Sequence, residues 1–237
     1  MPEISIKAEK IFKIFGLEIT NSLILSIVVS FVFTIFAIKY FFDSQKNSKT
    51  KFYYFVNFFL KIIYQLFRSI LNEKVDYFFP LLASFFIFIL IQNWFGLLPG
   101  VGSILFHHVP LLRAGTADLN TTLSLALLSV IITQISGIKY LGFKNYLKKF
   151  INFTNPIAFF TGILEIISEF SKIISFSFRL FGNIFAGEVL LTIMAFLVPI
   201  LASFPFLILE IFVGLIQALV FSMLTAVFLN LATSKEH

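Results

Sequence analysis

Long, uninterrupted apolar stretches are the feature of this sequence that most constrains its fold. They occupy about residues 19–42, 77–98 and 121–141, and two further stretches together fill 156–232. A helix of about twenty apolar residues crosses the hydrocarbon core of a membrane. A transmembrane β-barrel would instead require short strands of alternating polarity. The sequence therefore predicts an all-α membrane protein with about five transmembrane helices.

The composition agrees with this class and excludes several others. Hydrophobic residues make up 59% of the 237 residues and charged residues 13%, whereas about a quarter of a soluble domain is charged. The chain has no cysteine, which rules out disulfides and zinc–thiolate sites. It also has no glycine-rich phosphate loop. We therefore expect no cofactor and no nucleic-acid partner, and no metal site at the adjacent His107 and His108.

Residues 1–76 form a predicted N-terminal region. Its first apolar stretch is too long for a signal peptide, which indicates a retained helix. Further on, residues 52–70 carry Lys61 and Arg68 one heptad apart among aromatic residues. This stripe predicts an amphipathic helix in the membrane interface, with a helix of a soluble loop as the alternative. Residues 77–237 hold the remaining membrane helices, and the two regions form a single integral membrane domain.

The last two apolar stretches are longer than a perpendicular crossing requires. Tilting accommodates such excess length. They meet near Pro199 and Pro205, which we expect to bracket a turn. The sequence therefore predicts two long, strongly tilted helices packed as a hairpin. Further upstream, Asp118 followed by Asn120 predicts the N-cap of another helix.

The basic residues predict the orientation of the chain. Six lysines and arginines lie in 43–76 and four lysines in 139–149, whereas 99–120 contains only Arg113. Cytoplasmic loops carry the excess of basic residues. This places the first two segments in the cytoplasm, the N-terminus outside and the C-terminus inside.

Charged and polar residues form a stripe along the first helix of the predicted hairpin. At about 100° per residue, its members fall within about 60° of one line. They are Glu165, Ser168, Glu169, Lys172, Ser175, Arg179 and Asn183. An arginine at the centre of a membrane costs roughly 2.5–3.5 kcal/mol. Glu188 falls on roughly the opposite face, about 13 Å further along.

Ordinary structural roles could explain part of this pattern. Glu169 and Lys172 have the i,i+3 spacing of a local ion pair. Arg179 could form a structural bridge with Glu188 or Glu210. Two glycines nearby, Gly182 and Gly187, are expected to allow a neighbouring helix to approach closely. On the last helix, Glu210, Gly214, Gln217 and Phe221 share one face.

Four motifs resemble subunit a of F-type ATP synthases. They are "NWFGLLPG", "ADLNTTLSLAL", "SFRLFGNIFAGEVLL" and "GLIQALVFSMLTAVFL", and they span most of residues 90–232 in the order that the family shows. The resemblance implies a non-catalytic stator subunit that carries protons through two offset half-channels beside a rotating ring of c subunits. It also implies the peripheral-stalk b subunit and the remaining ATP synthase subunits as partners, in a bacterial plasma membrane.

The resemblance also implies the residues of the ion pathway. Arg179 matches the arginine that faces the ring carboxylates, and Asn183 belongs to the same element. The other matching positions are Glu188, Glu210, Gln217 and, in the cytoplasmic half-channel, Glu165. Many bacterial members have histidine where this chain has Glu210. Two other classes remain as alternatives at this point: a secondary transporter with an intramembrane acidic site, and a purely structural assembly subunit.

Overall fold

The computed structural model describes residues 8–14, 17–46, 48–98, 105–106, 109–151, 155–198 and 203–234. Helices dominate these residues. The α-helices are α1 (Asn21–Gln45), α2 (Lys51–Leu71), α3 (Val75–Gly96), α4 (Leu119–Leu141), α5 (Phe143–Phe150), α6 (Pro156–Leu197) and α7 (Ser203–Thr233). The described residues also contain two short 3-10 turns, η1 (Asn72–Lys74) and η3 (Gly115–Ala117). Five helical stretches are long and apolar enough to cross a membrane, which confirms the predicted fold class.

Two small hairpins are the β-structure of the described residues. Strand β1 (Lys10–Ile14) pairs antiparallel with β2 (Leu17–Thr20), directly before α1. Strand β3 (Leu105–Phe106) pairs with β4 (Val109–Pro110) in the loop between α3 and α4. Both hairpins lie outside the five helical stretches that are long enough to cross a membrane.

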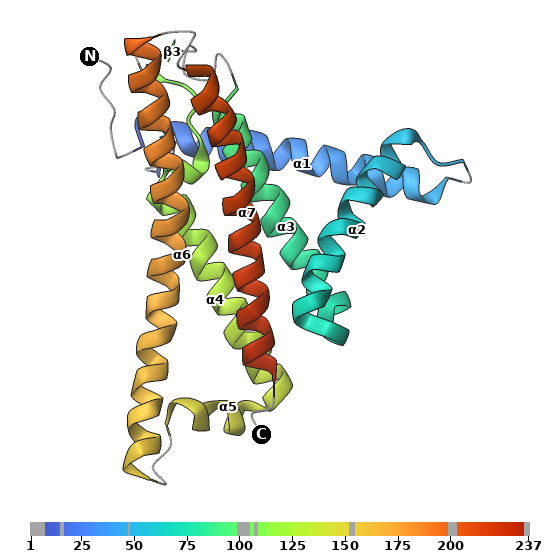
Figure 1. The fold of residues 1–237 in the computed structure, drawn as a ribbon, viewed down its shortest axis with the longest axis vertical. Helices are drawn as coiled ribbons and strands as arrows, with labels where there is room; N and C mark the ends of the chain where they lie inside the picture. The colour runs from blue at the N-terminus through green and yellow to red at the C-terminus, as the bar shows by residue number, and fades with distance from the viewer. Residues whose placement is uncertain are drawn as a thin grey trace.

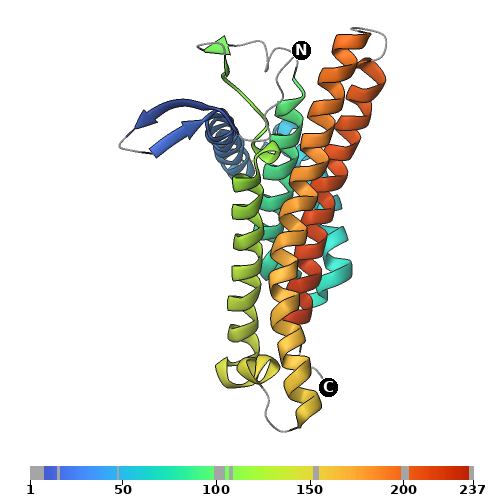
Figure 2. The ribbon, with the colours of Figure 1, turned by 90° about the vertical axis from the view of Figure 1, so that its left-hand side faces the viewer.

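The two longest helices form the predicted hairpin. Helices α6 and α7 run side by side in both views (Figures 1 and 2), whereas α1 runs across their direction. Helix α6 has 42 residues and is about 63 Å long at 1.5 Å per residue, about twice the thickness of a hydrocarbon core. A helix of this length fits within the membrane only when it is strongly tilted, and its direction across α1 agrees with such a tilt. The tilt itself stays a prediction.

The turn of this hairpin differs from the prediction at one residue. Pro205 lies in the first turn of α7, which begins at Ser203, and does not bracket the turn from outside. A proline is tolerated there because the backbone N–H that it lacks would have no partner within the helix. Pro199 lies outside the described residues.

Helix α2 is amphipathic, as predicted, and is separated from α3 by a sharp change of direction. Asn72 has a φ of 50° and a ψ of −121° at this point, a combination outside the regions that residues other than glycine usually adopt. Ile63 and Phe67 are buried and belong to the main core cluster, whereas Lys61 and Arg68 are exposed. The placement of this helix in the interface and the division of the chain at residue 76 stay predictions.

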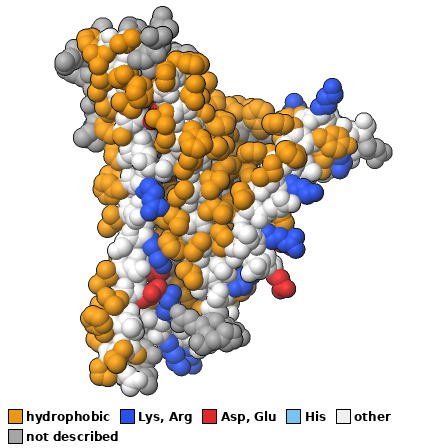
Figure 3. Space-filling view, in the orientation of Figure 1, with side chains coloured by type: hydrophobic (Ala, Val, Ile, Leu, Met, Phe, Trp, Pro, Cys, Tyr) orange, Lys and Arg blue, Asp and Glu red, His pale blue; other side chains and the backbone are white. Residues whose placement is uncertain are grey.

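The core lies where α3, α4, α6 and α7 meet. Aromatic rings fill its centre: Phe221 of α7 contacts Phe176 of α6 at 5.0 Å and Phe85 of α3 at 5.6 Å between ring centroids. Small buried residues such as Ala126 and Ala218 let the helices approach closely. Large hydrophobic side chains cover much of the molecular surface that Figure 3 shows, as expected for a surface that meets lipid or partner subunits.

Candidate functional site

A buried loop before α4 shapes one end of the bundle. All three residues of η3 are buried. The backbone N–H of Gly115 donates to Gln92 of α3 at 3.3 Å, and Thr116 donates to Asn93 at 2.6 Å. The Asn93 amide in turn donates to the carbonyl of Gly214 in α7 at 2.9 Å. These bonds fix the loop against two helices.

Asp118 completes the anchoring of this loop. Its carboxylate accepts the backbone N–H of Asn120 at 3.0 Å, which confirms the predicted N-cap of α4. The other carboxylate oxygen accepts the hydroxyl of Ser22 in α1 at 2.7 Å. Asp118 therefore joins the first membrane helix to the loop that carries Arg113.

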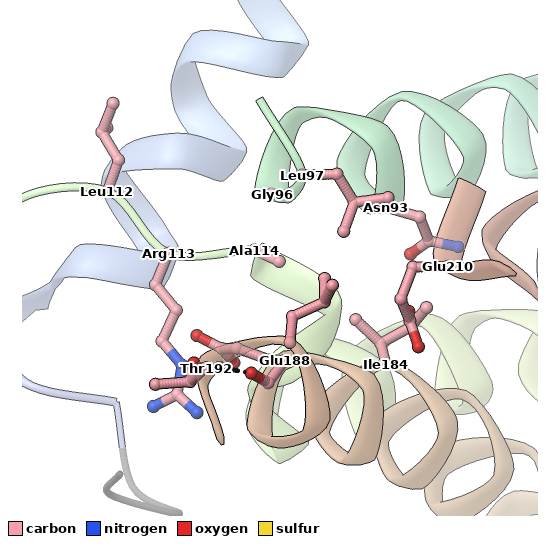
Figure 4. Close-up of a pocket in the computed structure, with 11 residues that line it drawn as sticks. Asn93, Gly96, Leu97, Leu112, Arg113, Ala114, Ile184, Glu188, Thr192 and Glu210 are labelled. Carbon is pink, nitrogen blue, oxygen red and sulfur yellow. Dashed lines mark hydrogen bonds and ion pairs between the residues drawn. The ribbon is translucent and has the colours of Figure 1, made fainter. Parts of the chain in front are cut away.

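A cavity of about 160 Å³ lies between this loop and the helices α3, α6 and α7. Its polar lining, shown in Figure 4, comes from all of these elements and consists of Asn93, Arg113, Glu188, Thr192 and Glu210. Glu188 of α6 and Glu210 of α7 thus line one polar space. We call it the outer cavity, after the side of the membrane that the sequence predicts for this loop.

Glu188 is paired with Arg113. Its carboxylate lies 3.2 Å from Nε of Arg113, whose side chain is only 8% exposed. The guanidinium also lies 5.7 Å from the centre of the Phe185 ring. The structural bridge considered for Glu188 therefore exists, but its cation is Arg113 and not Arg179. Sequence reasoning treated Arg113 only as a loop charge; its position as the one lysine or arginine of residues 99–120 was the available signal.

Glu210 occupies space that a glycine leaves open. A Cβ atom at Gly187 would collide with the carboxylate of Glu210, which is 5% exposed. The expected close approach at Gly187 is therefore confirmed, and the approaching group is a carboxylate. The same expectation for Gly182 is wrong among the described residues, because a Cβ there would meet no atom within 4 Å.

Arg179 has a different environment from Arg113. Its side chain is exposed on α6, and its guanidinium donates to the hydroxyl of Ser175 at 3.3 Å. Within the described part of the chain, no acidic group lies within salt-bridge distance of it. It lines a small cleft together with Gln217 of α7. Asn183, one turn further along α6, is also exposed.

The other end of α6 carries two ion pairs. Glu165 lies 2.8 Å from Lys149 of α5, and Glu169 lies 2.6 Å from Lys172, the local pair that the spacing predicted. Tyr146 of α5 donates its hydroxyl to Gln134 of α4. Burial and the charges of Glu169 and Glu165 raise the pKa of Tyr146 to about 12. This end is thus a second polar site, about 34 Å from Glu188 along the helix.

The predicted stripe on α6 therefore divides into two parts. Its three charged residues at one end, Glu165, Glu169 and Lys172, are half-buried, whereas Arg179 and the three uncharged polar residues are exposed: Ser168, Ser175 and Asn183. Among the described residues, no group of three or more potential ligands could hold a metal ion. His107 and His108 lie outside those residues.

The fold and these groups define a class: an all-α integral membrane protein with ionisable side chains at several depths of a long helical hairpin. Such groups are rare within membranes and mark ion or substrate pathways. The family model described as ATP synthase A chain matches residues 22–230. The chain therefore belongs to the ATP synthase subunit a family.

Curated relatives agree with this assignment. ATP synthase subunit a of Syntrophobacter fumaroxidans is 38% identical over 173 residues, which cover 71% of this chain and 66% of the relative. The subunit a of Moorella thermoacetica is 35% identical over 171 residues, 72% of each chain. That of Gloeobacter violaceus is 38% identical over 175 residues, 71% of this chain and 67% of the relative. The alignments thus span about two thirds of the length of these relatives.

Proposed function

We propose that this chain is the proton-translocating stator subunit of an ATP synthase membrane sector. It provides two offset half-channels, and Arg179 faces carboxylates on a rotating ring of c subunits. The observation that carries the proposal is the setting of Arg179, an exposed cation on a largely apolar helix without an acidic partner in the described residues. Such a charge is costly in a membrane unless another molecule supplies the counter-charge.

The chemistry of arginine suits this role. A guanidinium stays protonated at any relevant pH. It favours the ionised form of a carboxylate that comes close, so a ring site releases its proton on arrival. It also repels cations in a low-dielectric environment, which prevents leakage between the two half-channels.

The two polar sites supply access from opposite sides. The outer cavity contains Glu188 and Glu210, and the other end of α6 contains Glu165. Arg179 lies between them, about 13 Å from the level of Glu188 and about 21 Å from that of Glu165. Protons enter through one site, travel on the ring and leave through the other.

The surroundings of each site support the predicted orientation. Glu165 lies against α5, which contains Lys144, Lys148 and Lys149, and basic segments face the cytoplasm. The outer cavity lies beneath the loop that has few basic residues. The N-terminus is therefore outside and the C-terminus in the cytoplasm of a bacterial cell.

Gln217 and Asn183 assist Arg179. Gln217 lines the same cleft as the guanidinium, and Asn183 follows it on the exposed face. Both side chains can hydrogen-bond either to the guanidinium or to an arriving carboxylate. The proposed partners are the c-subunit ring, the b-subunit stalk and the other ATP synthase subunits, and the chain itself catalyses no reaction.

The test is proton pumping by the whole complex in liposomes. Arg179→Ala should abolish ATP-driven pumping while the complex still assembles, because only the counter-charge is lost. Arg179→Lys should also fail, because a compact ammonium lacks the planar fork of donors that a guanidinium offers to a carboxylate. Arg68→Ala, at an exposed position on α2, is the matched control and should pump normally. Near-normal pumping by Arg179→Ala refutes the proposal, and ion transport by the isolated chain would favour a secondary transporter.

A further inference from the structure

The two acids of the outer cavity have unequal surroundings. Figure 4 shows Glu188 beside Arg113, and Glu210 reaching in from α7 at the other side of the cavity. The Arg113 guanidinium lies 3.2 Å from Glu188 and is 8% exposed. Glu210 lies against Gly187 and has no basic partner in the described part of the chain. One carboxylate is therefore fixed in an ion pair, and the other is not.

The charges around the cavity come from several elements of the described chain. Arg113, Glu188 and Glu210 are the charged residues that line it, and Glu9 lies within electrostatic range of Glu188. Because the guanidinium does not lose its proton, it attracts Glu188 as a carboxylate. Protonation of Glu188 would remove the negative charge from this pair, in which the arginine side chain is 8% exposed and the glutamate side chain 37%, and would weaken the charge-assisted bond between them.

Glu210 is also placed on the route to Arg179. Along α7, Glu210 and Gln217 share a face at a separation of about 10 Å, and Gln217 lines the cleft that contains Arg179. Gly214 lies between them on this face and contacts Asn93 of the cavity wall. A proton on Glu210 is therefore on the face that leads toward the ring-facing cleft.

We infer that Arg113 is a positioning residue that holds Glu188 as a fixed ion pair, and that Glu210 is the carboxylate that accepts and releases the proton. In this step a hydrated proton from the cavity binds the Glu210 carboxylate and leaves a water molecule. Glu210 then gives the proton to a ring carboxylate and becomes ionised again. The inference rests on the proposed function and assigns different tasks to its two outer acids.

Neutralising the pair tests this division in reconstituted complexes. Glu210→Gln should lower pumping by about 100-fold or more, the typical contribution of a positioned proton-transfer group. Arg113→Gln and Glu188→Gln should each impair pumping, because each breaks the ion pair that positions Glu188. The double variant Arg113→Gln/Glu188→Gln removes both charges and should regain most of the wild-type rate. Lys10→Gln/Glu18→Gln neutralises an exposed pair of the N-terminal hairpin and is the matched control.

The double variant decides whether Glu188 carries protons, because a single variant that breaks the ion pair can fail to assemble for structural reasons alone. If the double variant assembles and is as inactive as Glu210→Gln, Glu188 is itself a proton carrier and the inference is wrong. If Arg113→Lys, which keeps the charge, pumps no better than Arg113→Gln, the charge of Arg113 is not what matters and the inference is again wrong.

Carbodiimide labelling gives a readout that a merely structural role would not change. Carbodiimides react with protonated carboxylic acids, and peptide mass spectrometry locates the product. Labelling of Glu188 should be low in the wild type and in Arg113→Lys, and at least tenfold higher in Arg113→Gln. Equal labelling in all three refutes the ion-pair role of Arg113. This result does not depend on pumping, so it is distinguishable from failure of the proposed function, which the Arg179 variants test.

Discussion

The contact between Gly187 and Glu210 allows one substitution to move a single carboxylate. In Gly187→Ala, the new methyl group would overlap the carboxylate carbon and both oxygens of Glu210. Restoring ordinary van der Waals separation requires the carboxylate to withdraw by about 1.5–2 Å. The end of a glutamate side chain can rotate away, and alanine favours a helix over glycine by about 1 kcal/mol. The variant should therefore fold and assemble.

Its proton flux should nevertheless fall steeply. A misplacement of about 1 Å in a reacting group can cost about 100-fold in rate, so Gly187→Ala should lose most of its ATP-driven pumping. A second substitution, Glu210→Asp, shortens the side chain by one carbon–carbon bond, about 1.5 Å, and makes room for the methyl group. The double variant Gly187→Ala/Glu210→Asp should recover part of the lost flux.

The assay is fluorescence quenching by a pH-sensitive dye in liposomes that contain equal amounts of assembled complex. Gly182→Ala gives the same gain in helix propensity without a collision, and serves as the control for assembly and thermal stability. Unchanged pumping in Gly187→Ala would refute the placement of the Glu210 carboxylate at this contact. A double variant that pumps less than either single variant would refute the steric explanation.

Three further predictions concern other contacts. Gln217→Leu should slow pumping without abolishing it, a milder defect than that of Arg179→Ala. The reason is that loss of one hydrogen bond to a charged group costs about 1.5–3 kcal/mol. A complete loss of pumping would contradict the role of Gln217 as a hydrogen-bond partner. Asp118→Ala removes the α4 cap and the bond to Ser22, so it should lower the free energy of unfolding by about 1–2 kcal/mol in detergent denaturation. Asp118→Asn should lower the free energy of unfolding by less. The raised pKa of Tyr146, about 12 against an ordinary 10.0, means that the unfolded chain loses this proton first, so stability should fall as pH rises from 10 to 12. Tyr146→Phe should show a shallower fall in melting temperature between pH 9 and 11.5, and identical slopes would contradict the buried setting of the hydroxyl.

The membrane helices could be predicted from the sequence because their signal is local. A run of apolar residues identifies a span without reference to the rest of the chain, and the predicted stretches agree with α1, α3 and α4 to within a few residues. The N-cap at Asp118 and the pair of Glu169 with Lys172 were also predictable, since both depend on residues within one turn of each other.

The contacts that shape the outer cavity depend on residues far apart in the sequence. Arg113 and Glu188 are separated by 75 positions, and nothing in the local pattern of either indicates the other. The segment after α4 was predicted only to be cytoplasmic; in the structure Phe143–Phe150 forms α5 and brings Lys149 to Glu165. Its lysines give it the composition of a solvated connector, and packing of Tyr146 against Gly137 holds it in place.

The central claim, two access sites on opposite sides of Arg179, is tested most directly by sided thiol labelling. The chain contains no cysteine, so single cysteines at positions 188 and 165 report only on themselves. Assembled complexes in vesicles of known orientation are treated with a membrane-impermeant thiol reagent from one side at a time. Position 188 should be labelled from the outside and position 165 from the cytoplasmic side. Labelling of both positions from the same side would contradict the claim.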